Sequence, residues 1–433
     1  MTRQKIIAGI DIGSSKTTTL IAAIAQEDGR IKIIGVSSIP SKGMRRGQIV
    51  NIEEASASLT TSVEAAERMA GYNLNQAYIS VGGPQIVSQN SHGVVAVAEP
   101  DGEINDEDVR RVIEAARAVS LPSSREIIHV VPRNYTVDGQ EGVKDPVGMS
   151  GVRLEVETHL VSGATTSLRN LTKCINEVGI DPQGLIFSGL AASDSVLTET
   201  DKELGVVLVD IGGGTTSVTI FVDGAPFYAA VLPVGARNIT NDLAVGLRMS
   251  LDTAEVIKLG LSKKEKVLVL PEGETPKEKK LDEDELQLSD LGIQDEQKSV
   301  SKKTLIEGII RPRLNEIFTM VGMEIKKSGA AGLTPSGIVV CGGGGLTPGV
   351  SDSAKRILAM PVRIGYPQGL SGLIDDIQTP EFAVVTGLLL RGSNTDTKTS
   401  TNFAFGNLGK SLHHLPVKGI FGRILDLLKS FLP

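Results

Sequence analysis

The sequence predicts an α/β protein with two lobes, on three observations. The chain has 433 residues, more than one hydrophobic core normally organises, so two or more domains are expected. One pattern, an apolar strand, then Asp-Ile-Gly, a turn of small residues and a second β-rich strand, occurs at residues 6–24 and again at 205–222. A third glycine-rich turn follows an apolar strand at residues 336–349. Two matched turns that face each other across a cleft could hold a chain of phosphates from both sides.

The first copy carries the groups that such a site needs. Asp11 stands near the strand end, where it could hold a hydrated Mg²⁺. Gly13 is expected to take a positive φ and to let backbone approach a ligand. Ser14 and Ser15 add hydroxyl donors, and Lys16 adds a positive charge for a β- or γ-phosphate. Alone, this copy is equally compatible with an ordinary Asp-Gly hairpin.

The second copy repeats the pattern with Asp210 in the carboxylate position. Its turn offers the same glycines and hydroxyls, and the glycines are again expected to allow a positive φ. The turn residues are Gly212, Gly213, Gly214, Thr215 and Thr216. Two matched copies favour a phosphate clamp over two unrelated hairpins.

The third element is a run of four glycines between an apolar strand and a helix predicted over residues 350–358. A bare turn lets a flat ring lie against backbone, and a helix start favours negative charge nearby. It is neither a Walker A motif nor a G-x-G-x-x-G fingerprint. With the two Asp-Gly turns, it makes a nucleotide the first ligand to consider. Its glycines are Gly342, Gly343, Gly344 and Gly345.

Bulk properties exclude several classes of protein. The chain is 40% hydrophobic and 22% charged, without an apolar run long enough for a membrane span or a signal peptide. Cys174 and Cys341 lie in apolar contexts and are expected to be reduced and packed. A net charge of −7, 3% aromatic residues and no tryptophan argue against nucleic-acid binding.

The first lobe is predicted to open with strands at residues 6–10, 17–24 and 31–38, a helix at 52–70 and a strand at 78–81. Residues 85–160 then have the pattern of an insert. In it, Asn105 and the acidic residues after it predict a capped helix over residues 109–119 between strands. A helix at 166–178, a strand at 185–188 and a small-residue helix at 189–197 return to the first lobe. The second lobe begins at residue 205, and its charged stretch at 262–303 predicts strands with solvated loops rather than a recognition run.

The three motifs, in this order, resemble those of the actin, Hsp70 and sugar-kinase superfamily. Within it, residues 33–51, 129–161 and 185–216 resemble the bacterial cell-division family FtsA, and the resemblance runs from about residue 5 to about residue 390. It implies an actin-like fold of two lobes with duplicated ribonuclease-H-like domains and an FtsA-type insert in the first lobe. In the first lobe, the implied subdomain 1A comprises residues 1–84 and 161–196, and the insert 1C comprises residues 85–160. In the second lobe, subdomain 2A comprises residues 197–246 and 331–390 (with a return to 1A), and subdomain 2B comprises residues 247–330. A linker at 391–416 and a terminal helix at 417–433 follow.

The resemblance also implies that ATP binds between the lobes, with Mg²⁺ held through water by Asp11 and Asp210. The four glycines would line the adenosine, with Glu255 and Lys258 near the ribose and base. That pair, three residues apart, is also compatible with an ordinary helix surface. Relatives carry a Gln or Glu for the attacking water on the segment that matches residues 166–178, where this chain has no obvious counterpart. Slow or weak ATP hydrolysis is therefore expected, and no catalytic residue is named.

The C-terminal end has the composition of a flexible linker followed by an amphipathic helix. The helix could dock on the protein's own core. The resemblance instead implies a membrane-targeting sequence whose basic residues meet an anionic surface. Its apolar residues are Ile420, Phe421, Ile424, Leu425, Leu428, Phe431 and Leu432.

Partners are implied by the resemblance alone. The outer subdomain of the second lobe would bind the C-terminal peptide of the ring protein FtsZ, with Arg311 and Arg313 facing it. The alternative for these two residues is a pair of solvated arginines at a helix start. The insert would serve self-association into filaments and contacts with later divisome membrane proteins.

The predicted function is an ATP-binding scaffold on the inner face of the cytoplasmic membrane at the division septum, where it tethers FtsZ. The alternative is a small-molecule kinase of the same superfamily, which would need a carboxylate base and a pocket for an acceptor. A chaperone of the Hsp70 type would need a long substrate domain after the second lobe, where this chain has only a linker and a tail.

Overall fold

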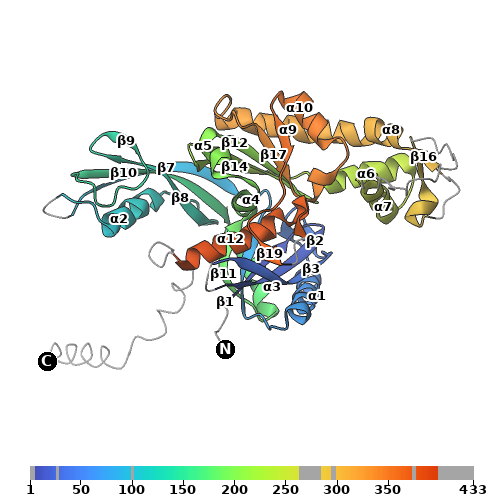
Figure 1. The fold of residues 1–433 in the computed structure, drawn as a ribbon, viewed down its shortest axis with the longest axis horizontal. Coiled ribbons are helices and arrows are strands. Elements are labelled where there is room, and N and C mark those ends of the chain that lie inside the picture. The colour runs from blue at the N-terminus through green and yellow to red at the C-terminus, as the bar shows by residue number, and fades with distance from the viewer. Residues whose placement is uncertain are drawn as a thin grey trace, which may run out of the picture. The chain divides into compact units, whose positions relative to one another are not determined.

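The computed structural model describes residues 5–25, 29–98, 102–262, 284–293, 299–372 and 377–397. All of them belong to one unit, which ends at Thr397. The predicted amphipathic helix and most of the predicted linker lie outside the described residues. Figure 1 shows the arrangement of the elements.

The first lobe is a six-stranded sheet in the order β11-β6-β1-β2-β3-β19. The neighbours β1, β2 and β3 are antiparallel, whereas β6 runs parallel to β1 and β11 parallel to β6. Helices α1 and α3 pack on one side of the sheet and α12 on the other (Figure 1). The elements are β1 (Lys5–Ile12), β2 (Lys16–Ile24), β3 (Ile31–Pro40), α1 (Ile52–Ala70), β6 (Gln76–Val81), α3 (Thr165–Glu177), β11 (Asp181–Phe187), β19 (Ser371–Gly372) and α12 (Ala383–Thr397). A two-stranded turn of β4 (Met44–Arg45) and β5 (Gln48–Ile49) follows β3.

The sheet of the second lobe repeats this pattern in the order β14-β13-β12-β17-β18. Three antiparallel strands are again followed by two that run parallel to the central strand. The duplication seen in the Asp-Gly turns therefore extends to the whole sheet. The strands are β12 (Val206–Ile211), β13 (Thr216–Val222), β14 (Ala225–Leu232), β17 (Ile338–Cys341) and β18 (Val362–Ile364).

Helices and a small outer part complete the second lobe. The charged stretch predicted to contain strands does contain the pair β15–β16 within its described residues. Helix α10 occupies the predicted residues 350–358. The elements are α6 (Ala236–Leu247), α7 (Leu251–Ser262), β15 (Glu285–Gln287), the single 3-10 turn η1 (Leu288–Leu291), β16 (Ser299–Ser301), α8 (Lys302–Leu305), the π-helical turn η2 (Ile306–Ile310), α9 (Arg311–Ser328), the 3-10 turn η3 (Gly343–Leu346) and α10 (Val350–Leu358).

The predicted insert is a separate sheet with one helix and its own hydrophobic core. Asn105 caps α2 as predicted, and its side chain accepts hydrogen bonds from the backbone N–H groups of Glu107 and Asp108. The sheet contacts the second lobe at β14, where the Arg133 guanidinium lies 4.8 Å from the centre of the Phe227 ring. The elements, at the left of Figure 1, are β7 (Val87–Ala96), α2 (Asp106–Arg117), β8 (Arg125–Val137), β9 (Gln140–Val143) and β10 (Arg153–Ala164).

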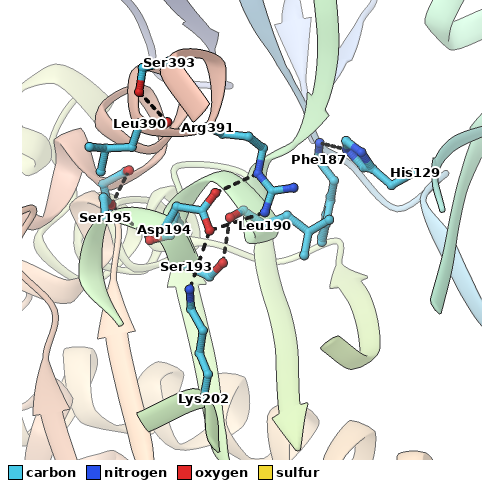
Figure 2. Close-up of polar contacts among 12 residues, drawn as sticks. His129, Phe187, Leu190, Ser193, Asp194, Ser195, Lys202, Leu390, Arg391 and Ser393 are labelled. Carbon is cyan, nitrogen blue, oxygen red and sulfur yellow. Dashed lines mark hydrogen bonds and ion pairs between the residues drawn. The ribbon is translucent and has the colours of Figure 1, made fainter. Parts of the chain in front are cut away.

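Two short helices join the lobes: α4 (Ser188–Val196), the predicted small-residue helix, and α5 (Glu199–Leu204). Helix α4 crosses α12 closely, because a Cβ at Gly387 would lie 1.7 Å from the Ala191 carbonyl oxygen. The Asp194 carboxylate of α4 accepts a hydrogen bond from Arg391 Nε at 2.7 Å (Figure 2). Nearby, the backbone N–H of Phe187 donates to Nε2 of the half-buried His129, whose pKa is lowered to about 3 by desolvation and then by the charge of Arg391.

This contact corrects the predicted start of the linker. The polar composition of residues 391–397 favours a linker. In the structure they continue α12 to Thr397, and the Arg391–Asp194 pair holds the first of them on α4. The remaining subdomain boundaries stay predictions. Cys174 and Cys341 are both buried free thiols, as predicted.

Candidate functional site

The three predicted turns meet at one cleft between the lobes. The β1–β2 turn comes from the first lobe, and the β12–β13 turn and the loop after β17 come from the second. Most of the residues expected to bind a nucleotide line this cleft. They are Asp11, Gly13, Ser14, Ser15, Lys16, Asp210, Gly212, Gly213, Thr215, Glu255, Lys258, Gly342, Gly343 and Gly344.

The surroundings of the two carboxylates at the cleft destabilise their ionised forms. Burial raises the pKa of Asp11, and the hydrogen bond that Ser80 Oγ donates to Asp11 Oδ1 at 2.5 Å offsets this only in part. Burial and then the charge of Asp11 raise the pKa of Asp210 to about 7. A cation between the two turns would relieve both effects.

This donor set fits a hydrated Mg²⁺ better than a closed metal centre. In the described part of the chain, no group of three or more His, Cys, Asp or Glu side chains could enclose a metal ion. Mg²⁺ is typically held by one or two carboxylates together with water and phosphate oxygens. Asp11 and Asp210 can supply that share of the ligands, directly or through water.

The glycines of the two Asp-Gly turns differ from the prediction in one respect. None of Gly13, Gly212, Gly213 and Gly214 has a positive φ. Their small size is needed for close approach instead, because a Cβ at Gly213 would lie 1.9 Å from Ser15 Oγ in the opposite turn. The expectation of left-handed backbone was therefore wrong, whereas the expected close approach of backbone to a ligand stays a prediction.

Gly342 does have the positive φ expected of a turn glycine, at 79°. A Cβ at this position would lie 2.3 Å from Asp210 Oδ1, so any larger residue would collide with the carboxylate. The backbone N–H of Gly342 donates to the Pro380 carbonyl oxygen at 2.9 Å. The loop is thereby tied both to the carboxylate and to the segment that enters α12.

Three of the predicted residues lie outside the cleft lining. The Thr216 hydroxyl is fully buried and donates to the Val234 carbonyl oxygen at 2.9 Å, so it supports the turn. A Cβ on Gly214 would meet Ser14 Oγ at 2.8 Å, which places this glycine against the first lobe. Gly345 packs behind the loop, with a Cβ position 3.7 Å from Val340.

Glu255 and Lys258 line the cleft as one hydrogen-bonded group on α7. Lys258 Nζ donates to Glu255 Oε2 at 2.7 Å and to Thr240 Oγ1 at 2.8 Å. Thr240 Oγ1 in turn donates to Glu255 Oε2 at 2.5 Å. The pair therefore differs from the ordinary surface pair considered from the sequence, because Lys258 is buried and both residues face the cleft.

Sequence reasoning missed several lining residues, and most of them come from outside the motifs. Glu381 pairs with Lys16, and Arg237 stands at the start of α6, where its backbone N–H donates to the Gly213 carbonyl oxygen at 2.8 Å. Only Ser80, at the end of a predicted strand, carried a sequence signal, since polar groups that end parallel strands often meet at one sheet edge. Other missed residues with polar side chains or no side chain are Thr18, Ser38, Gly47, Gly82, Ser188 and Ser217.

Helix α3, on which the resemblance implies a residue that orients water, lines a small pocket beside the cleft through Ser167, Leu168 and Leu171, but not the cleft itself. Its Glu177 accepts a hydrogen bond from Ser56 at 2.9 Å on another surface. The described cleft thus offers no counterpart on α3 of the implied Gln or Glu.

Arg311 and Arg313 lie at the start of α9 in the outer part of the second lobe. They are not the solvated arginines considered as the alternative, because their side chains are 26% and 25% exposed and each is paired. Arg311 pairs with Glu307, and Arg313 Nε donates to Asp242 Oδ2 at 2.7 Å. The predicted membrane residues from Ile420 to Leu432 lie outside the described residues.

Comparisons with solved structures define the class of fold. A PilM–PilN type IV pilus biogenesis complex matches with a TM-score of 0.60 at 17% identity, covering 89% of this chain and 98% of that one. MreB 5 of Spiroplasma citri bound to AMPPNP matches with a TM-score of 0.51 at 13% identity, covering 92% and 99%. The fold is the two-lobed, actin-like one, with a cleft between the lobes.

Sequence comparisons show the family. A model described as the SHS2 domain inserted in FTSA matches residues 83–162, and one described as cell division protein FtsA matches residues 207–387. Cell division protein FtsA of Pseudomonas aeruginosa is 38% identical over 90% of this chain and 89% of its own length. That of Bacillus subtilis is 35% identical over 90% and 84%. The chain belongs to the FtsA family of cell-division proteins.

Proposed function

We propose that this chain is an ATP-binding scaffold of cell division that assembles at the membrane. The observation that carries the nucleotide part is the pair of carboxylates between two matched glycine turns, the half-buried Asp11 and the buried Asp210. Two carboxylates whose charges repel in a buried cleft are poised to hold a cation together with phosphates. Family membership supports the rest of the proposal.

Each part of the nucleotide would have its own group of residues. Mg²⁺, when bound, would neutralise phosphate charge, with Asp11 and Asp210 holding its waters. Lys16 and Arg237 would face the phosphates, together with the hydroxyl groups of the two turns. Glu255 and Lys258 would face the ribose and base, and the bare turn of Gly342, Gly343 and Gly344 would lie against the adenosine. Because α3 brings no water-orienting side chain to this cleft, hydrolysis is expected to be slow.

Nucleotide binding is tested by titrating MgATP into the full chain and into Asp210→Asn by isothermal calorimetry. We expect binding by the full chain, and a loss of at least about tenfold in the variant, since one ligand for the hydrated cation is removed. With EDTA in place of Mg²⁺, the two proteins should differ little. Equal MgATP affinity for both proteins would refute the assignment of Asp210.

The C-terminal segment is proposed to attach the protein to the inner face of the cytoplasmic membrane at the septum. None of the described helices is long and apolar enough to cross a bilayer. The predicted amphipathic helix at residues 417–433 would lie in the interface, with apolar residues in the acyl region and basic residues at anionic headgroups.

Membrane binding is tested by co-sedimentation with anionic vesicles. The full chain should pellet, and a chain that stops after Thr397 should remain soluble. The cut is placed there because α12, including its pair with Asp194, must stay intact. Leu428→Glu should abolish pelleting, whereas Ser430→Glu, which adds the same charge on the predicted polar face, should not. Pelleting of the truncated chain would contradict the proposal.

The outer part of the second lobe is proposed to bind the C-terminal peptide of FtsZ, and the insert to support filaments and later division proteins. An acidic peptide at Arg311 would have to exchange with Glu307, and one at Arg313 with Asp242. In an anisotropy titration with that peptide, Arg311→Ala should weaken binding. Arg356→Ala is the control, because Arg356 is an exposed arginine on α10 that contacts Asn315. Equal binding by both variants would remove Arg311 from the peptide site.

A further inference from the structure

Lys16 has an acidic partner that neither the repeated motif nor the family description assigns. Its ammonium forms an ion pair with the Glu381 carboxylate, and both side chains line the cleft beside Asp11 and Asp210. The two residues are 365 positions apart in the chain. The Lys16 side chain is 52% exposed and that of Glu381 is 27% exposed, so the pair stands at the edge of the cleft where solutes can reach it.

The segment that carries Glu381 is held firmly at both lobes. Glu381 lies in a single 3-10 turn, η4 (Pro380–Phe382), directly before α12 of the first lobe. The Pro380 carbonyl oxygen accepts the backbone N–H of Gly342 from the second lobe at 2.9 Å. Thr379 Oγ1 lies 3.4 Å from Glu381 Oε1 and donates to it. The carboxylate is thus presented to Lys16 from a fixed backbone, rather than from a free loop.

We infer that Glu381 is the built-in counter-ion of Lys16, which the phosphates of a nucleotide must displace or share, and that it thereby lowers affinity for di- and triphosphates. The inference rests on the nucleotide binding proposed above. Lys16 is the cation at the first Asp-Gly turn, so a phosphate held by this turn competes with Glu381 for the same ammonium group.

The charges around the pair indicate the direction of the effect. The cleft already contains the carboxylates Asp11, Asp210 and Glu255, and a bound polyphosphate adds further negative charge. Mg²⁺, when bound, would compensate for the first two carboxylates, whereas Lys258 pairs with Glu255 at 2.7 Å. In the described part of the chain, the cation that pairs with Glu381 is Lys16, which a phosphate also needs. Neutralising Glu381 frees Lys16 for phosphate and removes a repulsive charge near the site.

The test compares the affinities of MgATP, MgADP and AMP for the full chain and for Glu381→Gln by calorimetry. The glutamine variant should bind MgATP and MgADP on the order of tenfold more tightly, because the ion pair that competes with phosphate for Lys16 at a partly exposed site is removed. AMP, which lacks β- and γ-phosphates to reach Lys16, should bind equally well to both proteins.

Three further variants separate charge from shape. Glu381→Ala should tighten MgATP binding as Glu381→Gln does. Glu381→Asp keeps the charge, so its affinity for MgATP should stay close to that of the full chain. Glu203→Gln is the matched control, since Glu203 pairs with Lys144 at 3.3 Å on an exposed surface away from the cleft. It should leave all three affinities unchanged, and thermal melting should show that all the variants are folded.

The outcomes distinguish this inference from the proposed function. If the full chain binds MgATP but Glu381→Gln leaves the affinity unchanged or weakens it, the counter-ion role is wrong and nucleotide binding stands. A gain that is equally large for AMP would also overturn it, because the effect would not act through the phosphates at Lys16. If the full chain binds none of the three nucleotides, the proposed function fails, and this inference fails with it.

Discussion

Replacing Asp210 by asparagine should stabilise the protein in EDTA without nucleotide, by an amount that grows with pH. In the folded chain, burial and then the Asp11 charge raise the pKa of Asp210 to about 7, from 3.8. The folded state therefore holds this proton more tightly than the unfolded state does. The contribution of Asp210 to the unfolding free energy is most favourable below pH 3.8, decreases as the pH rises to about 7, and is then constant.

The magnitude follows from the same two values. The raised pKa of Asp210 lowers the unfolding free energy by on the order of 4 kcal/mol at pH 8. At pH 5 it lowers the unfolding free energy by roughly 2 kcal/mol, because the folded protein keeps the proton and the unfolded chain loses it. Asparagine has nearly the same shape and no charge, so it escapes this cost at every pH. The gain in unfolding free energy from Asp210→Asn should therefore rise by about 2.5 kcal/mol between pH 5 and pH 8.

The assay is urea unfolding of both proteins at pH 5, 6, 7 and 8. Asp201→Asn is the control with the opposite sign. Although burial by itself raises the pKa of Asp201, the hydrogen bonds from Thr198 and the charge of Arg363 together lower it. The stabilisation from Asp201 is present above pH 3.8 and is lost only as the pH falls through its lowered pKa, so removing Asp201 should lower the unfolding free energy by the same amount at all four pH values. A stability difference for Asp210→Asn that does not change with pH would refute the reasoning.

Three further perturbations test other parts of the structure. Arg237→Ala should weaken MgATP binding by about fivefold to tenfold in calorimetry without lowering the melting temperature, because an exposed cation at the cleft is lost; unchanged affinity would remove Arg237 from the site. Asp194→Ala should lower the unfolding free energy by about 1–2 kcal/mol and speed hydrogen exchange at the end of α12, since Arg391 loses its carboxylate; unchanged exchange would show that the pair does not hold the helix. Gly387→Val should lower the unfolding free energy by more than about 3 kcal/mol, because a Cβ at this position would lie 1.7 Å from a backbone oxygen of α4. Gly308→Ala should leave the unfolding free energy unchanged or raise it, because nothing lies within 4 Å of its Cβ position.

The parts of the cleft that are local in sequence could be predicted from sequence. A strand, an aspartate and a glycine turn are consecutive residues, so their order alone places Asp11 and Asp210 at the ends of β1 and β12. The duplication of these turns also predicted two lobes, and the matching order of the two sheets bears this out. Asn105 likewise predicted the start of α2, because a helix cap is a contact between near neighbours.

What depends on contacts between distant segments had to come from the tertiary structure. Glu381 carries no motif, and only the packing of η4 against the loop at Gly342 brings it to Lys16. The glycine turns also depend on contacts between distant segments. The small size of Gly213 is required by Ser15 of the other lobe and not by the backbone angles of Gly213. The end of α12 shows the same limit, since a polar composition predicted a linker where the Arg391–Asp194 pair holds a helix. Local sequence sets backbone preference and the chemistry of each turn, whereas which charges become partners is decided by how the lobes pack.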